Sequence, residues 1–162
     1  MNSSQLAWNF ELCDSEYHPF SLSDHIGRNL VLAFFPNPFG PVCIGEMKEL
    51  ADRMDMFEMA DCEVIAISKN NPSCLAEMKR KLRLPFTVLS DFNGDVSKTY
   101  SGFYDNYGGV SGLSLTRRAV FMIEKGGNIV YRWIGLLPDE EPKYWEIEDI
   151  LGKWRSENET VH

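Results

Sequence analysis

Apolar residues along the chain follow two patterns, one typical of β-strands and the other of α-helices. Residues 30–35 and 63–68 form apolar runs of strand length, which predicts strands with both faces buried in the middle of a sheet. Shorter strands are expected at 5–12 and 86–89. Helices are expected where apolar residues recur every three or four positions, at 42–60, 74–82 and 142–154, and over a short segment ending near residue 100.

The last two predicted strands form a hairpin. Residues 119–124 and 128–133 flank Lys125-Gly126-Gly127, a glycine-containing turn. The segment 102–114, rich in glycine and aromatic residues, is expected to be a loop. Strands alternate with helices up to this hairpin, and a helix follows it. This order predicts one α/β domain over residues 1–162, with a central mixed β-sheet flanked by helices.

Composition narrows the classes of partner. Of 162 residues, 44% are apolar, which suffices for a buried core, and the net charge is −8. That charge opposes binding to nucleic acid and to anionic membranes, so neither is an expected partner. No apolar stretch is long enough to span a bilayer, and residues 1–5 lack the features of a signal peptide. We therefore expect a cytoplasmic protein.

Four cysteines offer candidate chemistry: Cys13, Cys43, Cys62 and Cys74. No two of them form a C-x-x-C pair, so the sequence gives no support to a zinc site. A disulfide framework is not expected in a cytosolic chain of this size. Two interpretations of the thiols are left: packing residues, or one reactive cysteine.

Cys43 has the position of a reactive thiol. It lies just inside a predicted helix that follows a buried strand and a proline-rich loop. Unpaired amides at a helix N-terminus stabilise a thiolate, so the thiol pKa is expected to fall below its usual value. Pro36 and Pro38 stiffen the loop and remove competing donors. A buried cysteine that packs as a small apolar residue fits this position equally well.

Motifs favour the reactive interpretation. Residues 34–46 read FFPNPFGPVCIGE and resemble the active-site loop of the peroxiredoxins (AhpC/TSA family), commonly P-x-x-x-T-x-x-C. Residues 118–126 resemble the later strand of that family, whose arginine completes the site. Tyr131-Arg132-Trp133 and the acidic segment 138–141 are most similar to the AhpE-like branch, with PrxQ/BCP second. The resemblance implies a thioredoxin-like fold with an N-terminal β-hairpin extension.

The resemblance also implies roles for particular residues. Cys43 would be the peroxidatic nucleophile, shielded by Pro36, and Arg118 would donate to the thiolate and to the peroxide. Glu46 would orient the arginine; otherwise it is a solvated acid of the first helical turn. Arg118 could instead be a surface strand residue. The adjacent Arg117 points to the opposite face, so an alignment shifted by one residue would exchange the two arginines.

One position departs from the family pattern. Gly40 stands where the family usually has threonine or serine, whose hydroxyl holds the peroxide. Backbone amides near Val42 and Cys43 can still donate to a substrate. If the missing hydroxyl is one hydrogen-bond donor simply lost, the activation barrier for peroxide reduction is expected to rise by ~2–4 kcal/mol.

Recycling of the oxidised cysteine needs a second thiol. Cys74 is the candidate resolving residue, as in PrxQ-like members, but it follows Cys43 by only 31 positions and its helix would have to unwind. Lys48 occupies the position that other members use. Packing or capping is the preferred role of Cys74. We therefore expect a one-cysteine mechanism with an external thioredoxin- or glutaredoxin-like reductant.

The expected function is thus a thiol peroxidase that reduces hydrogen peroxide or alkyl hydroperoxides through a Cys43 sulfenic acid. No metal or other cofactor is expected, because sulfur carries the chemistry. The resemblance implies a homodimer. Two alternatives stay open. A thiol–disulfide oxidoreductase is disfavoured because Cys43-Ile44-Gly45-Glu46 is not C-x-x-C, and a redox sensor or interaction module with weak peroxidase activity is supported by Gly40.

Overall fold

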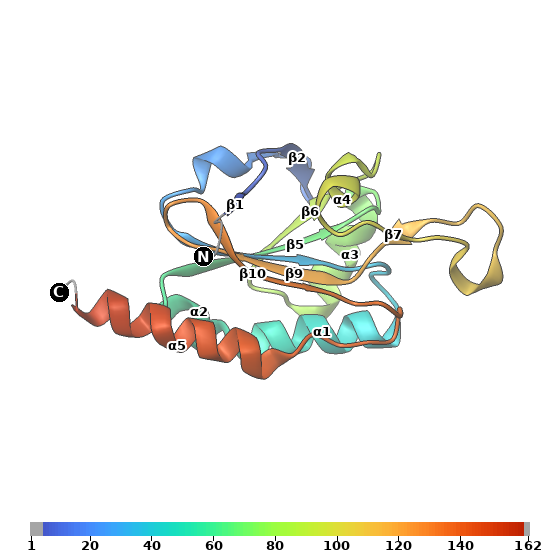
Figure 1. The fold of residues 1–162 in the computed structure, drawn as a ribbon. Helices are drawn as coiled ribbons and strands as arrows, with labels where there is room; N and C mark the ends of the chain where they lie inside the picture. The colour runs from blue at the N-terminus through green and yellow to red at the C-terminus, as the bar shows by residue number, and fades with distance from the viewer. Residues whose placement is uncertain (1–4, 161–162) are drawn as a thin grey trace.

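The computed structural model describes residues 5–160 and contains an eight-stranded mixed sheet (Figure 1). From one edge to the other the strands are β1 (Gln5–Leu6), β10 (Asn128–Ile134), β9 (Ala119–Ile123), β4 (Asn29–Phe34), β5 (Cys62–Ser68), β6 (Thr87–Ser90), β2 (Glu11–Asp14) and β3 (Pro19–Ser21). Strands β4, β5 and β6 are parallel, and β9 runs antiparallel to β4. This mixed sheet confirms the predicted α/β fold.

Alternating residues of β4 serve two separate cores. Val31 and Ala33 face one core, where they pack with apolar residues of the helices α1 (Pro41–Asp52), α2 (Met54–Met59), α3 (Pro72–Leu82) and α5 (Tyr144–Thr160). Leu30 and Leu32 face the other core, covered by the N-terminal segment and the helix α4 (Asp95–Tyr100). A strand with a period of two explains this division, and it explains why residues 30–34 are all apolar.

The N-terminal segment differs from the prediction of one strand at 5–12. Strand β1 pairs with β10 at one edge of the sheet, whereas β2 pairs with β6 and forms a hairpin with β3 at the other edge. Between them the chain crosses the sheet, and Phe10 packs beside Phe20 and Tyr100 in the second core. Burying Phe10 takes precedence over continuing the strand. The predicted N-terminal hairpin extension is present as β2–β3.

The predicted helix at 42–60 is broken at Arg53. This residue has φ −101° and ψ 11°, so α1 ends before it and α2 begins after it. Its guanidinium turns back to the Glu49 carbonyl (2.8 Å) and lies over the Tyr144 ring, 4.8 Å from the centroid. Apolar periodicity continues across the break, which is why the sequence pattern did not reveal it.

Two further segments also differ from prediction. Helix α5 continues past Trp154 to Thr160, in turns that are polar and therefore carry no apolar pattern. The expected loop at 102–114 contains strand β7 (Phe103–Tyr104), which pairs with β8 (Leu115–Thr116), and a short 3-10 helix, η2 (Tyr107–Gly109); a second, η1 (Leu22–Asp24), follows β3. Residues 105–114 project from the body of the fold (Figure 1).

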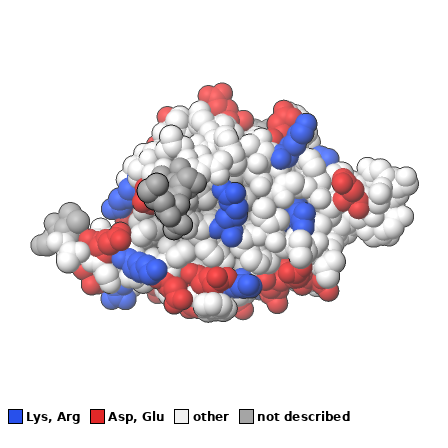
Figure 2. Space-filling view, viewed as in Figure 1, with Lys and Arg blue, Asp and Glu red and all other residues white. Residues whose placement is uncertain are grey.

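Acidic side chains gather along the lower edge of the face drawn in Figure 2, over helices α1 and α5, with a few basic side chains among them. This distribution fits the net charge of −8. Among residues 5–160, no helix is both long enough and apolar enough to cross a bilayer.

Candidate active site

Cys43 is held at the start of α1, directly beyond the end of β4. Pro41 is the first residue of the helix, where a missing N–H costs nothing, and Gly40 precedes it in an extended conformation (φ −72°, ψ 144°). The Cys43 side chain faces the sheet and only 2% of the residue is exposed. The sulfur is therefore almost entirely buried.

Arg118 meets Cys43 from the neighbouring strand. Residue 119 pairs with Phe34, so the residue just before β9 lies beside the end of β4. The guanidinium Nη1 donates to Cys43 Sγ (3.3 Å) and to Glu46 Oε1 (2.7 Å), while Nη2 donates to the Pro138 carbonyl (2.9 Å). Arg118 is 1% exposed, so the interpretation of a surface strand residue is wrong.

Arg117 has a different environment. Its Nε donates to the Gly135 carbonyl (2.6 Å), and its guanidinium lies 5.7 Å from the centroid of the Tyr104 ring. The two consecutive arginines thus point to opposite sides of the strand, and Arg118 is the one that contacts the sulfur.

Glu46 lies one helical turn after Cys43 and is fully buried, so the interpretation of a solvated first-turn acid is wrong. Its Oε1 accepts from Arg118, but Oε2 is buried and has no hydrogen-bond partner among the described residues. Burial raises the pKa of the Glu46 carboxyl to about 7, and the charge and hydrogen bond of Arg118 oppose this shift. A carboxylate with one unsatisfied oxygen is costly to ionise in such a place.

The pKa of the Cys43 thiol is raised above its usual value, whereas the sequence predicted that it would be lowered. Loss of hydration on burial is the largest cause. Arg118 lowers the pKa by charge and hydrogen bonding, as does the Asn37 backbone, and Glu46 raises it further. The prediction from the position of Cys43 at a helix N-terminus did not include this loss of hydration. Arg118 is therefore the main group that favours the thiolate, and Glu46 competes for the same cation.

A small cavity of about 110 Å³ opens onto the sulfur. Its walls come from three loops that are distant in sequence: Asn37, Gly40, Pro41, Val42 and Cys43 from the first, Tyr107 and Arg118 around the second, and Pro138 and Asp139 from the third. The predicted Gly40 and Val42 are both present. Pro36 is buried nearby but is not among the lining residues. Sequence reasoning missed Tyr107, Pro138 and Asp139 as part of the site, because no local pattern brings their loops together.

Tyr104 fixes the loop that supports Arg118. Its hydroxyl lies 3.1 Å from the Gly135 carbonyl and 3.2 Å from the Leu137 carbonyl, and it accepts from the Arg118 amide at 3.3 Å. A β-carbon at position 135 would lie 3.0 Å from this hydroxyl, so any side chain there would press against Tyr104. Tyr104 therefore holds both the strand that carries Arg118 and the loop whose Pro138 carbonyl receives its Nη2.

Replacing Tyr104 by phenylalanine is expected to lower the free energy of unfolding by about 1–3 kcal/mol, because carbonyls of residues 135 and 137 lose a buried donor. The Pro138 carbonyl should then hold Arg118 less firmly, and the Cys43 pKa should rise. Urea unfolding and thiolate absorbance at 240 nm measure the two effects. Tyr107→Phe is the matched control, since no hydrogen bond of the Tyr107 hydroxyl is found within residues 5–160.

The other cysteines lie away from this cavity. Cys62 is buried at the start of β5, and burial strongly raises its pKa. Cys74 is partly exposed in the first turn of α3, where its backbone amide donates to the Asn71 side chain (2.9 Å). Cys13 lies on β2 and lines a separate groove. In residues 5–160, no group of three or more His, Cys, Asp or Glu side chains is arranged to hold a metal.

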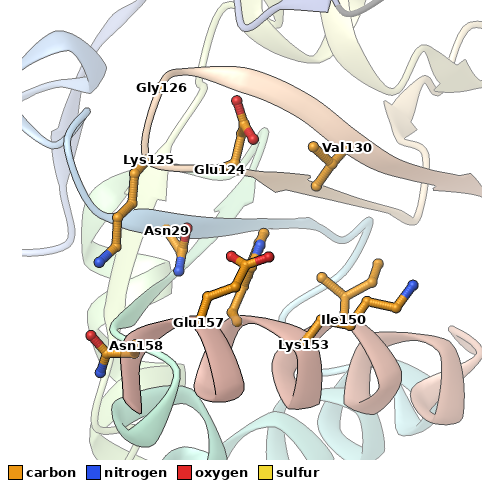
Figure 3. A pocket seen from close by; sticks show the side chains of 10 residues that line it. Asn29, Glu124, Lys125, Gly126, Val130, Ile150, Lys153, Glu157 and Asn158 are labelled. Carbon is orange, nitrogen blue, oxygen red and sulfur yellow. The ribbon is translucent and has the colours of Figure 1, made fainter. Parts of the chain in front are cut away.

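A larger cavity, of about 430 Å³, lies between the β9–β10 hairpin and α5 (Figure 3). Asn29, Lys125 and Glu157 are among its lining residues, and its walls include none of the predicted site residues. Of the predicted site residues, Gly40, Val42, Cys43 and Arg118 line the smaller cavity instead.

Known proteins are similar to this chain in sequence and in fold. Residues 4–132 match the AhpC/TSA family. The chain is 32% identical over 131 residues to peroxiredoxin Q, chloroplastic, of Oryza sativa subsp. japonica, which covers 81% of this chain and 58% of that protein. It is 30% identical over 132 residues to alkyl hydroperoxide reductase E of Mycobacterium tuberculosis, with coverage of 80% and 82%. The chain thus spans only about 58% of the length of the rice relative.

Solved structures confirm the thioredoxin-like peroxiredoxin fold. Peroxidoxin BcpB of Mycobacterium tuberculosis superposes with a TM-score of 0.78 at 21% identity, covering 96% of this chain and 97% of that one. A cysteine-to-serine mutant of PrxQ from Xylella fastidiosa gives a TM-score of 0.80 at 22% identity, with 98% of both chains covered. The family match, the identity to curated relatives and the fold all agree with the resemblance of the loop around Cys43. The chain is a member of the AhpC/TSA family of peroxiredoxins.

Proposed function

We propose that this protein is a thiol peroxidase that reduces a hydroperoxide through a sulfenic acid on Cys43. The observation that carries the proposal is the contact of Arg118 Nη1 with Cys43 Sγ at 3.3 Å, beside a small cavity. A guanidinium keeps its charge at any physiological pH and presents several donors in a fixed plane. It can therefore stabilise a thiolate and an oxygen that gains negative charge beside it.

The reaction follows from this geometry. Cys43 loses its proton, and the thiolate attacks the terminal oxygen of the hydroperoxide. An S–O bond forms as the O–O bond breaks, so Cys43 is oxidised to the sulfenic acid and the substrate is reduced. The remaining oxygen leaves as an alkoxide or hydroxide and takes up a proton to become an alcohol or water. Arg118 stabilises the charge on that oxygen, together with the backbone amides near Val42.

The family resemblance supplies roles for the other residues. In this proposal Pro36 keeps bulk water from the sulfur, Glu46 orients Arg118, and Gly40 and Val42 form the wall against which the peroxide lies. Burial of Pro36, the 2.7 Å contact between Glu46 and Arg118, and the cavity lining support these assignments. No step requires a metal or other cofactor.

The reductant is proposed to be an external thiol, such as a thioredoxin- or glutaredoxin-like protein. One thiol attacks the sulfenic sulfur and displaces water, and a second thiol releases Cys43 from the mixed disulfide. Cys74 is the alternative. Its helix α3 is well capped, by Pro72 at its start and by Asn71, which supports a structural role instead. An intramolecular disulfide in peroxide-treated protein, absent in Cys74→Ser, would favour Cys74.

Stopped-flow measurement tests the proposed activity. The reduced protein is mixed with hydrogen peroxide or an alkyl hydroperoxide, and tryptophan fluorescence and sulfenate trapping are followed, with Cys43→Ser as control. Cys43 should react orders of magnitude faster than free cysteine. A rate no greater than that of free cysteine would exclude the peroxidase and leave the redox sensor or interaction module as the better proposal. A thiol–disulfide oxidoreductase would reduce insulin disulfides.

We also propose a homodimer formed near the active-site loops. Exposed apolar side chains lie close in sequence to the residues that line the cavity: Phe39, Val110, Leu136 and Leu137. Patches of this kind favour protein contacts. Sedimentation velocity would detect the dimer, and Leu137→Glu should shift it toward the monomer. A cytoplasmic location of the protein is also a proposal, because the plant relatives are described as chloroplastic.

A further inference from the structure

Gly40 has none of the usual structural reasons to be glycine. Its backbone lies at φ −72° and ψ 144°, which any residue adopts without strain. A β-carbon built there would lie 3.6 Å from its nearest neighbours, which are atoms of Asn37, at ordinary van der Waals distance. Backbone geometry and crowding therefore both permit a side chain at this position.

Stability would even favour a polar side chain there. Gly40 is the N-cap of α1, and within the described chain that cap makes no side-chain hydrogen bond. Serine, threonine, aspartate or asparagine at an N-cap accepts a hydrogen bond from the first helical turn and stabilises the helix. Glycine is only slightly less favourable than these residues at an N-cap, so helix stability permits glycine at position 40 but does not require it.

The open space lies beside the reactive sulfur. Gly40 and Asn37 both line the cavity that contains Cys43 and Arg118. A side chain at position 40 would occupy this wall, and glycine leaves it vacant for part of a substrate. The rest of the lining includes Val42, Tyr107 and Pro138, which offer apolar surface. Such a lining suits a carbon group attached to the hydroperoxide.

The charges of the cavity select against anions. Among the described residues that line it, Arg118 is the one cation, and its guanidinium already contacts Glu46 and the Pro138 carbonyl. Asp139, an exposed acid, also lines the cavity. A negatively charged substrate therefore meets a carboxylate near the entrance and no free cation to offset it.

We propose that Gly40 is a specificity determinant: it widens the cavity for uncharged organic hydroperoxides, while Asp139 disfavours hydroperoxides that carry a carboxylate. This inference rests on the proposed peroxidase function and specifies its substrate class. It also gives the absence of a hydroxyl at position 40 a second consequence. Glycine removes a donor for the peroxide, and the same change makes room for the organic group.

Two substitutions at position 40 separate bulk from hydrogen bonding. Gly40→Ala adds a methyl group and no donor, so the rate ratio of cumene hydroperoxide to hydrogen peroxide should fall about tenfold, the effect of one carbon in a fitted pocket. Gly40→Ser adds a hydroxyl, so its rate with hydrogen peroxide should rise above that of Gly40→Ala. Gly45→Ala is the matched control, because a β-carbon there meets no described atom within 4 Å.

The proposed effect of Asp139 is tested by comparing an ω-hydroperoxy carboxylic acid with its methyl ester, two substrates of nearly equal size. The ester should react several-fold faster at low salt. Asp139→Asn should narrow the gap, and added salt should do the same, since exposed charges are screened over about 10 Å at 0.1 M. Urea unfolding of each variant shows whether it is folded.

The outcomes distinguish the two proposals. An unchanged cumene-to-hydrogen-peroxide ratio in folded Gly40→Ala overturns the role of Gly40, even where the wild-type protein is a rapid peroxidase. Equal rates for the acid and the ester overturn the role of Asp139. If wild-type Cys43 reacts with none of these peroxides faster than free cysteine, the peroxidase proposal itself fails.

Discussion

Removing the guanidinium of Arg118 is expected to slow the reaction of Cys43 with peroxide by about 10²–10³-fold, the usual effect of losing a preorganised donor to a developing oxyanion. The Cys43 pKa should rise at the same time, because Arg118 is the main group that opposes the effect of burial. Stopped-flow rates across a range of pH measure both effects, since the rate follows the thiolate fraction.

The choice of variant matters because Arg118 and Glu46 are buried together. Arg118→Met alone would leave the Glu46 carboxylate without its partner, which costs about 3–5 kcal/mol in comparable buried pairs. The informative comparison is therefore Arg118→Met with Glu46→Gln against Glu46→Gln alone. Arg117→Met is the adjacent control and should change the rate only a few-fold. An equal loss in the Arg117 variant would contradict the assignment of Arg118.

Replacing Glu46 by glutamine should change how stability depends on pH. The Glu46 pKa is raised from 4.5 to about 7 in the folded protein, so between these values the folded state binds a proton that the unfolded state has released. The free energy of unfolding therefore falls as pH rises through this window, by about 3 kcal/mol in total, since one pKa unit corresponds to 1.36 kcal/mol. Glutamine does not titrate and lacks this loss.

Urea unfolding of the wild type and of Glu46→Gln at pH 4.5, 6 and 7.5 measures the difference, which should grow in favour of the variant as pH rises. Glu49→Gln on the same helix, where the carboxylate is half exposed, controls for the removal of an acid. The Cys43 pKa should also fall in Glu46→Gln, because a nearby negative charge is gone. Parallel curves for Glu46→Gln and wild type would refute a raised Glu46 pKa.

The sequence predicted the central strands well, because β4 and β5 are mostly apolar on both faces. Short apolar runs of this kind usually form buried strands. The break at Arg53 and the last turns of α5 were missed for opposite reasons. At Arg53 the apolar period continues although the helix stops. Beyond Trp154 the helix continues although the period stops, with an Arg155–Glu159 pair (3.1 Å) on its exposed surface.

Cys43, Arg118 and Glu46 were found from the sequence through a family resemblance, while Tyr104, Tyr107 and Asp139 were not. The first three lie in motifs with fixed local spacing. The others reach the site only because separate loops converge at one end of the sheet, which depends on the fold. The direction of the Cys43 pKa shift was missed for a related reason: helix position can be read locally, whereas burial of the sulfur depends on the surrounding chain.

The burial of Cys43 also bears on how soon a reductant could reach the sulfur after oxidation. A hydroperoxide group is small enough to enter the cavity, but the thiol of a folded reductant is attached to a surface too broad to follow it. Under the proposed function, reduction would therefore require the first turn of α1 to open, whereas oxidation would not. The lifetime of the proposed sulfenic acid would then be set by how often that turn unwinds, and a more stable helix start would leave the oxidised sulfur longer within reach of a second peroxide.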